Sequence, residues 1–143
     1  MSAIPINFFS EETDFKPKKV KALRNWLLKS IEAEKYSLEE LNFIYCSDEY
    51  LLKINKEYLN HDTYTDTVTF DNSEIEGKIL GDIFISIDRV RENAKTFSTT
   101  TEDELHRVMI HSTLHLLGYK DKSTKDKTEM TAKENKYLQL SGF

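Results

Sequence analysis

The sequence LGDIFISI, residues 80–87, is the strongest strand signal in the chain because isoleucine and phenylalanine dominate it. Shorter apolar strands are expected at residues 4–9, 41–46 and 67–70. Apolar residues at helical spacing predict helices from residue 18 (with Pro17 in the first turn), after residue 47, over residues 88–97, from residue 101, and from residue 123 to about residue 140. Three or four strands among about five helices predict an α+β domain with a small mixed sheet, whose strand directions the pattern leaves open.

Three helix starts carry residues that can satisfy free backbone N–H groups. Ser47 is placed to cap the second helix. Thr101 and Glu104 have the form of a capping box, and Ser123 with Asp126 opens the last helix. These signals mark where the helices begin.

The chain of 143 residues has the length of one domain, which we place at residues 1–143. Hydrophobic residues make up 38%, which is enough for a single core, and the chain has too many tyrosines and phenylalanines to be disordered. No apolar run approaches the roughly 18 residues of a membrane span, and residues 1–5 lack the pattern of a signal peptide. The single Cys46 excludes an internal disulfide framework. We therefore expect a cytoplasmic protein with no membrane partner.

Charge is distributed unevenly along the chain. Lysine and arginine sum to 20 and aspartate and glutamate to 25, a formal net charge of −5. This balance argues against a protein that coats nucleic acid. Basic residues nevertheless cluster in residues 16–35, and a second group comprises Lys120, Lys122, Lys125 and Lys127. Each group is either a solvated helix surface or a contact for RNA phosphates.

The segment HSTLHLLGYKD, residues 111–121, contains the clearest chemistry. His111 and His115 stand one turn apart on one helix face, where both can reach a single zinc ion. Gly118 can take the left-handed turn that reverses the chain and returns Asp121 to the ion. Two His and one carboxylate leave a position for water, which is typical of catalytic zinc.

Two other interpretations compete with a catalytic zinc. A His pair at this spacing also occurs by chance on helix surfaces. Certain zinc peptidases share the spacing, but they need a Glu directly after the first His as general base. Ser112 stands there and cannot take a proton from bound water, so a peptidase is disfavoured. We expect Ser112 to support the packing behind the site and not to act as a nucleophile.

Three motifs, in this order along the chain, resemble those of the YbeY family, the single-strand-specific metallo-endoribonucleases of bacterial ribosome maturation. They are Thr65-Asp66-Thr67-Val68-Thr69-Phe70, Gly81-Asp82-Ile83, and the His segment that ends in Gly118-Tyr119. The resemblance covers about residues 51–138, and the first 45 residues match in general layout only.

The resemblance implies a zincin-like metal helix with one Zn²⁺ on His111, His115 and Asp121, and with Thr65 and Asp66 nearby. A water on this zinc, or a ribose hydroxyl that the site activates, would attack the RNA phosphodiester. The implied activity is cleavage of single-stranded ribosomal RNA at the 16S rRNA 3′ end, with a role in ribosome quality control. The implied partners are the ribosome or its small subunit and associated proteins. The alternative is a ribosome-assembly factor that binds RNA or protein, carries the metal site and cleaves little.

The chain departs from the family pattern around two positions. The family usually has His at Asp121, preceded by Asp where this chain has Lys120, but Asp is an acceptable zinc ligand. It typically has Arg, facing RNA, at Leu59 and Pro at Tyr64. The site is therefore expected to lack one cation, and the basic residues that could replace it are His61, Lys120 and Lys122.

Four further polar residues have mainly structural interpretations. Asp82 either lies near the site or fixes a turn at a strand start, and the second is favoured. His106 lies about 140° around the helix from His111, so it cannot share the metal. His61 is expected in a solvated loop, and Cys46 as a small buried hydrophobe.

Overall fold

The computed structural model describes residues 3–142, so Met1, Ser2 and Phe143 lie outside the described residues. Within that range one sheet has the strand order β1-β2-β4-β3, with β1 (Ile6–Glu11), β2 (Ser37–Cys46), β3 (Thr67–Asp71) and β4 (Lys78–Ser86). The helices are α1 (Val20–Ala33), α2 (Asp48–Leu59), α3 (Ile87–Thr96), α4 (Thr101–Leu116) and α5 (Thr124–Gln139). Strands β1, β2 and β4 are parallel, and β3 runs antiparallel to β4 at one edge. The predicted α+β class with a small mixed sheet is confirmed.

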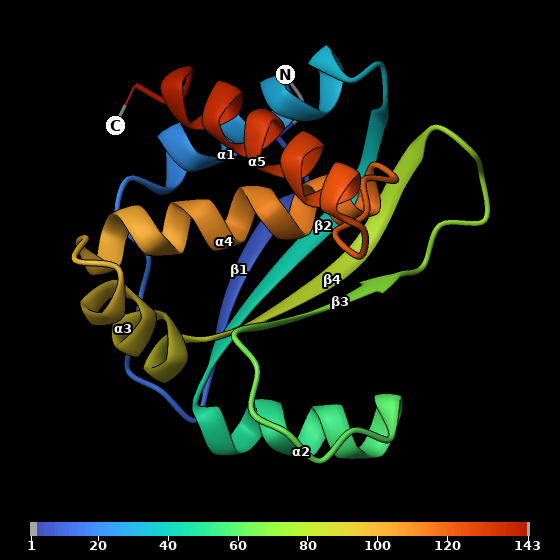
Figure 1. Ribbon diagram of the computed structural model, residues 1–143. Helices are drawn as coiled ribbons and strands as arrows, with labels where there is room; N and C mark the ends of the chain where they lie inside the picture. The colour runs from blue at the N-terminus through green and yellow to red at the C-terminus, as the bar shows by residue number, and fades with distance from the viewer. Residues whose placement is uncertain (1–2, 143) are drawn as a thin grey trace.

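Helices α1 and α4 pack on one face of the sheet, α5 lies against the outer side of α4, and α2 covers the other face (Figure 1). The larger core lies under α4, where Met109 and Leu114 pack with Ile85 of β4. The indole Nε1 of Trp26 in α1 donates a 2.7 Å hydrogen bond to the carbonyl of Tyr137, which joins the two outer helices. None of the helices found in residues 3–142 is both long and apolar enough to cross a membrane.

Helix α2 rests on a much smaller core on the opposite face. Its buried members are Cys46, Leu51 and Val68, with Phe70 and Phe84 packed against them. Cys46 is fully buried, as expected, and burial raises the pKa of its thiol to about 12. The sheet therefore separates two cores of unequal size.

Gly81 of β4 sets how closely the end of α4 approaches the sheet. A Cβ at this position would lie 2.7 Å from the carbonyl oxygen of Phe70 and 3.2 Å from the side chain of Leu116. Neither neighbour leaves room for a side chain, so only glycine fits. Because Leu116 directly follows His115, this contact also sets the depth of the metal helix beside β3.

The sequence-predicted ends of three elements need correction. Helix α1 begins at Val20, so Pro17 is not in its first turn. Lys19 has a φ of 53°, which a right-handed helix cannot include. Strand β2 begins at residue 37 instead of 41, because its first residues pair with the start of β4. Ile87 opens α3 and does not end the preceding strand.

The capping box expected at Thr101 and Glu104 is wrong by one residue. Thr100 caps α4, and its hydroxyl accepts a 3.0 Å hydrogen bond from the N–H of Asp103. Glu104 is consequently turned inward and buried. The predicted caps of α2 by Ser47 and of α5 by the residue pair 123 and 126 are confirmed.

Candidate metal centre

One helix end and the turn after it bring the three predicted ligands together. The Nε2 atoms of His111 and His115, in the second half of α4, are 3.1 Å apart. Gly118 has a φ of 97°, which is the predicted left-handed turn. After this turn, Oδ2 of Asp121 lies 3.4 Å from each of the two Nε2 atoms. Local sequence alone therefore builds most of the site.

The triangle of donor atoms has the dimensions of one face of a tetrahedral zinc site. Ligands of a tetrahedral ion are separated by about 1.63 bond lengths, so bonds of roughly 2.0–2.1 Å place them about 3.3–3.4 Å apart. The three observed edges measure 3.1, 3.4 and 3.4 Å. Imidazole nitrogen and carboxylate oxygen are also common zinc donors, so these residues fit one such ion.

Glu134 of α5, which the sequence analysis did not single out, supports His111 from behind. Its Oε2 lies 2.5 Å from Nδ1 of His111, and its Oε1 accepts a 2.8 Å hydrogen bond from Arg107. A carboxylate at Nδ1 favours the tautomer that carries the proton there, which leaves the Nε2 lone pair facing the donor triangle. The sequence did contain a signal for this role. Glu134 is an acidic residue on the same helix face as Met130 and Tyr137, and all three are buried.

The charge around His111 suits a cation. Burial lowers the pKa of His111, but the hydrogen bond and charge of Glu134, together with Asp121 and Asp66, outweigh this effect and raise it. The carboxylates that attract a proton to this ring also attract a divalent ion to its neighbourhood.

Glu34, at the C-terminal end of α1, anchors the turn that carries Asp121. Its carboxylate accepts hydrogen bonds from the hydroxyls of Tyr119 (2.5 Å) and Tyr137 and from Nζ of Lys133 (3.1 Å). Burial raises the pKa of Glu34, but these three donors outweigh it and lower the pKa below its usual value. Since Tyr119 lies two residues before Asp121, α1 and α5 both hold the third donor in place.

A cavity of about 450 Å³ opens beside the donor triangle. Its walls are the second half of α4, the edge strand β3 and the C-terminal end of α2. Thr65 and Asp66, the residues expected near the site, both line it. Ser112 is fully buried behind it, where its hydroxyl lies 2.9 Å from that of Thr67 and donates to the carbonyl of Val108. This placement agrees with the packing role expected for Ser112.

Asp66 is a partly buried carboxyl on the cavity wall with a raised pKa. Burial raises its pKa, and the nearby His111 and hydrogen bonds that include the N–H of Thr67 offset only part of the rise. Burial and the charge of nearby Asp66 also raise the pKa of Glu104. Asp66 therefore keeps a proton more readily than an ordinary aspartate does.

Leu59 lines the cavity at the position where the family pattern has Arg. Within residues 3–142, no lysine or arginine lines this cavity, and His61 does not line it either. Lys120 and Lys122 are exposed on the turn that flanks Asp121. None of the three suggested replacements thus restores a cation to the cavity.

The basic segment at residues 16–35 begins far from the donor triangle. Lys16 and Lys18 lie beside Thr101 and Glu102, at the N-terminal end of α4. At a rise of 1.5 Å per residue, this end is roughly 20 Å from His115. The start of the segment is therefore a separate surface.

Asp82 and Tyr64 have structural roles away from the cavity. Asp82 lies within β4, where its carboxylate accepts hydrogen bonds from the side chains of Asn42 (3.0 Å) and Asn72 (3.2 Å). The predicted turn is therefore wrong, and Asp82 is not among the cavity-lining residues. The hydroxyl of Tyr64 donates a 2.7 Å hydrogen bond to Glu49 at the start of α2.

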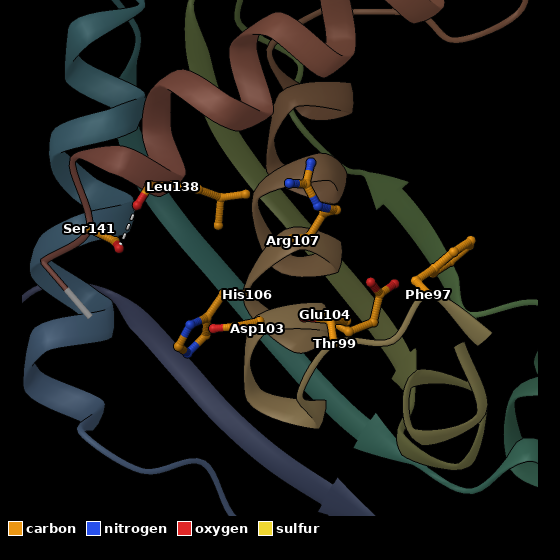
Figure 2. A pocket seen from close by; sticks show the side chains of 8 residues that line it. All are labelled: Phe97, Thr99, Asp103, Glu104, His106, Arg107, Leu138 and Ser141. Atoms are coloured by element: carbon orange, nitrogen blue, oxygen red, sulfur yellow. Dashed lines mark hydrogen bonds between the residues drawn. The ribbon is translucent and has the colours of Figure 1, made fainter. Parts of the chain in front are cut away.

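A larger cavity, about 590 Å³, adjoins the N-terminal half of α4 and includes Phe97 and Leu138 (Figure 2). His106 lines this cavity and not the donor triangle, as its angular distance from His111 predicted. Its ring packs edge-on against Trp26, with centroids 5.8 Å apart. Among residues 3–142, the one His, Cys, Asp and Glu group placed to hold a metal is the donor triangle, so we assign the chemistry to the smaller cavity.

Comparison with known proteins agrees with this geometry. The family model described as Endoribonuclease YbeY matches residues 6–142. The chain belongs to the YbeY family. An Endoribonuclease YbeY from Cytophaga hutchinsonii is 56% identical over 138 residues, which is 96% of each chain. That of Christiangramia forsetii is 48% identical over 135 residues, covering 94% of this chain and 93% of its own.

A solved structure of a Thermotoga maritima protein shares the fold of this YbeY-family chain. Its TM-score is 0.66 at 31% identity, and the match covers 95% of this chain and 88% of that one. The YbeY family match also includes the first strand and helix, where the sequence motifs showed only a similar layout. The resemblance drawn from three motifs is therefore confirmed and extended to nearly the whole chain.

Proposed function

We propose that this protein is a zinc-dependent, single-strand-specific endoribonuclease. Its proposed task is maturation of the 16S rRNA 3′ end and ribosome quality control in the cytoplasm, in association with the small ribosomal subunit. The name Endoribonuclease YbeY of its relatives supports RNA cleavage. The observation that carries the proposal is the donor triangle with edges of 3.1–3.4 Å on the wall of an open cavity.

His111, His115 and Asp121 would hold the zinc ion. When bound, zinc supplies a Lewis acid for a phosphoryl oxygen and lowers the pKa of a coordinated water. Glu134 keeps a proton at Nδ1 of His111, so that Nε2 stays free to bind. Asp66, on the cavity wall, is the carboxyl we propose to accept the proton of the water or ribose hydroxyl that attacks the phosphorus. As that P–O bond forms, the P–O bond to the leaving ribose oxygen breaks, and this oxygen takes a proton from solvent.

The same arrangement opposes a peptidase. The position after His111, where a peptidase of this spacing needs Glu, holds Ser112. Its hydroxyl is buried and engaged by Thr67 and the helix backbone, so it cannot reach a substrate.

The test measures zinc content and cleavage on the same preparations. Asp121→Ala should lose most bound zinc and RNA cleavage, whereas Asp14→Ala, a change at an exposed aspartate, should retain both. His115→Ala and its matched control His61→Ala should behave in the same way. The substrates are a single-stranded RNA, the same RNA in a duplex, and a generic peptide. We expect cleavage of the first alone, and full zinc occupancy in Asp121→Ala would refute the ligand assignment.

The cavity without lysine or arginine favours one second candidate, an assembly factor that binds through this site and cleaves little. Zinc-loaded protein that sediments with ribosomal small subunits and leaves single-stranded RNA intact would replace the nuclease proposal with this candidate.

A further inference from the structure

The C-terminal end of α2 presents an exposed apolar rim beside the metal cavity. Leu59 lines the cavity and is 41% exposed, and the preceding residue, Tyr58, is 65% exposed. Most large apolar side chains in residues 3–142 are buried. Two adjacent exposed ones, Leu59 on the cavity wall and Tyr58 next to it along the helix, therefore need a reason.

The ring of Tyr58 is held in place from the sheet side. It meets the ring of Phe70 at a centroid distance of 5.8 Å and an interplanar angle of 79°. Phe70 in turn packs against Phe84 at 5.7 Å and 86°. This row of edge-to-face contacts fixes Tyr58 while most of its surface stays open to solvent.

The row also lies at the edge strand that forms a cavity wall. Phe70 sits between Thr69 and Asp71 of β3, and both of these line the cavity. The carbonyl of Phe70 faces Gly81, which also lies against the side chain of Leu116 just after the metal helix's second His. A chain crossing β3 from the donor triangle toward α2 therefore meets Leu59 and Tyr58.

The cavity next to this rim is lined by acidic side chains. Asp66, Asp71 and Asp121 line the cavity, and in the described part of the chain no lysine or arginine does. Apart from a metal ion on the donor triangle, the cavity walls offer little attraction for the phosphates of an RNA segment. Its bases, in contrast, can gain contact with aromatic and apolar side chains, a mode of binding that depends little on sequence.

We propose that Tyr58 and Leu59 form a subsite that stacks one unpaired nucleobase next to the phosphate held at the metal centre. This inference rests on the proposed nuclease function and adds how the single strand is held. A base paired within a duplex has its faces covered by its neighbours, so it cannot enter the subsite. The rim thereby contributes to selection of single strands.

The experiment uses the zinc-loaded full chain and a short single-stranded RNA, with variants in which one nucleotide at a time lacks its base. Tyr58→Ala should lower kcat/KM on the intact RNA by about 5- to 150-fold, mainly through KM, because one base–aromatic stack is lost. Tyr58→Phe should cleave like the unaltered protein. Phe97→Ala removes an equally exposed aromatic at the larger cavity and should have no effect. Zinc content should stay constant in all of them.

The abasic series identifies the stacked base. At one position, loss of the base should weaken cleavage by the unaltered protein, and Tyr58→Ala should cause no further loss there. Tyr58→Leu keeps an apolar side chain against Phe70, and it should also be impaired while remaining folded.

The two proposals fail differently. If Tyr58→Ala and Tyr58→Leu cleave intact RNA as well as the unaltered protein, the stacking subsite is refuted and the nuclease function stands. If the unaltered, zinc-loaded protein does not cleave, the nuclease proposal fails. Binding of the same RNAs by fluorescence anisotropy then decides the subsite: affinity lost with Tyr58→Ala and with one removed base supports it, and unchanged affinity overturns it.

Discussion

Replacing Glu134 by Gln tests whether α5 takes part in metal binding. The carboxylate has two oxygens and two partners, because Oε1 accepts from Arg107 and Oε2 pairs with Nδ1 of His111. An amide has a single acceptor oxygen, so Gln can satisfy one of these donors and must turn its NH₂ toward the other. The change thus removes one contact and one negative charge at nearly constant volume.

The expected loss of zinc affinity follows from where the two contacts lie. The Glu134 side chain is 8% exposed, so a hydrogen-bond donor that loses its partner there can form few hydrogen bonds with water in its place. The Arg107 side chain is 41% exposed and can be solvated, which leaves the His111 contact as the main loss. Loss of such a carboxylate partner typically weakens metal binding about 10- to 100-fold, or about 1.4–2.7 kcal/mol. We expect Glu134→Gln near the lower limit and Glu134→Ala near the upper one.

Competition with a chromogenic chelator gives the zinc dissociation constants of both variants. Glu129→Gln, an exposed glutamate of the same helix, is the matched control and should bind zinc like the unaltered protein. Nitrogen-15 NMR of the zinc-free protein reports the tautomer of His111, which should carry its proton on Nδ1 and become mixed in Glu134→Ala. Unchanged affinity together with an unchanged tautomer in Glu134→Ala would show that Glu134 has no role at the metal centre.

Two further predictions concern stability. Gly81→Ala places a Cβ 2.7 Å from the carbonyl of Phe70 and should destabilise the fold by about 1–3 kcal/mol in urea unfolding, and an unchanged midpoint would contradict the close approach. Burial lowers the pKa of His111, but Glu134 together with Asp121 and Asp66 outweighs it and raises the pKa above the ordinary value of about 6.5. The contact therefore stabilises the zinc-free protein fully below about pH 6.5, and this stabilisation is lost as the pH rises through the folded-state pKa. Melting in chelator should show a larger fall between pH 6 and pH 8 for the unaltered protein than for Glu134→Gln, and equal falls would refute the coupling.

The sequence predicts the metal centre well where it is built from neighbours along the chain. The spacing of His111 and His115 is fixed by helix geometry, and Gly118 marks the turn that returns Asp121. These relations lie within the eleven residues 111–121 and need no knowledge of how the helices pack. The same holds for the caps at Ser47 and Ser123, because a cap is a contact between residues three positions apart.

Contacts between residues far apart in the sequence could not be predicted from the sequence. Glu134 lies 23 residues after His111, and its contact depends on how α5 crosses α4. The interpretation of Asp82 failed for the same reason, since its partners come from a neighbouring strand and a loop. The misplaced cap at Thr101 has a different cause: two adjacent threonines offer equivalent caps, and the sequence pattern does not distinguish between them.

The unequal cores on the two faces of the sheet give the two walls of the metal cavity different mechanical properties. The wall with His111 and His115 is part of α4, which packs into the large core. The wall with Leu59 is the end of α2, which rests on a small core with three buried members among the described residues. Opening fluctuations require least free energy where few apolar contacts are broken, so amide hydrogen exchange should be fastest in α2. In the proposed nuclease, the wall with Leu59 would then yield to an incoming strand while the wall with the two histidines keeps its shape, so that entry of RNA would not disturb the metal ligands.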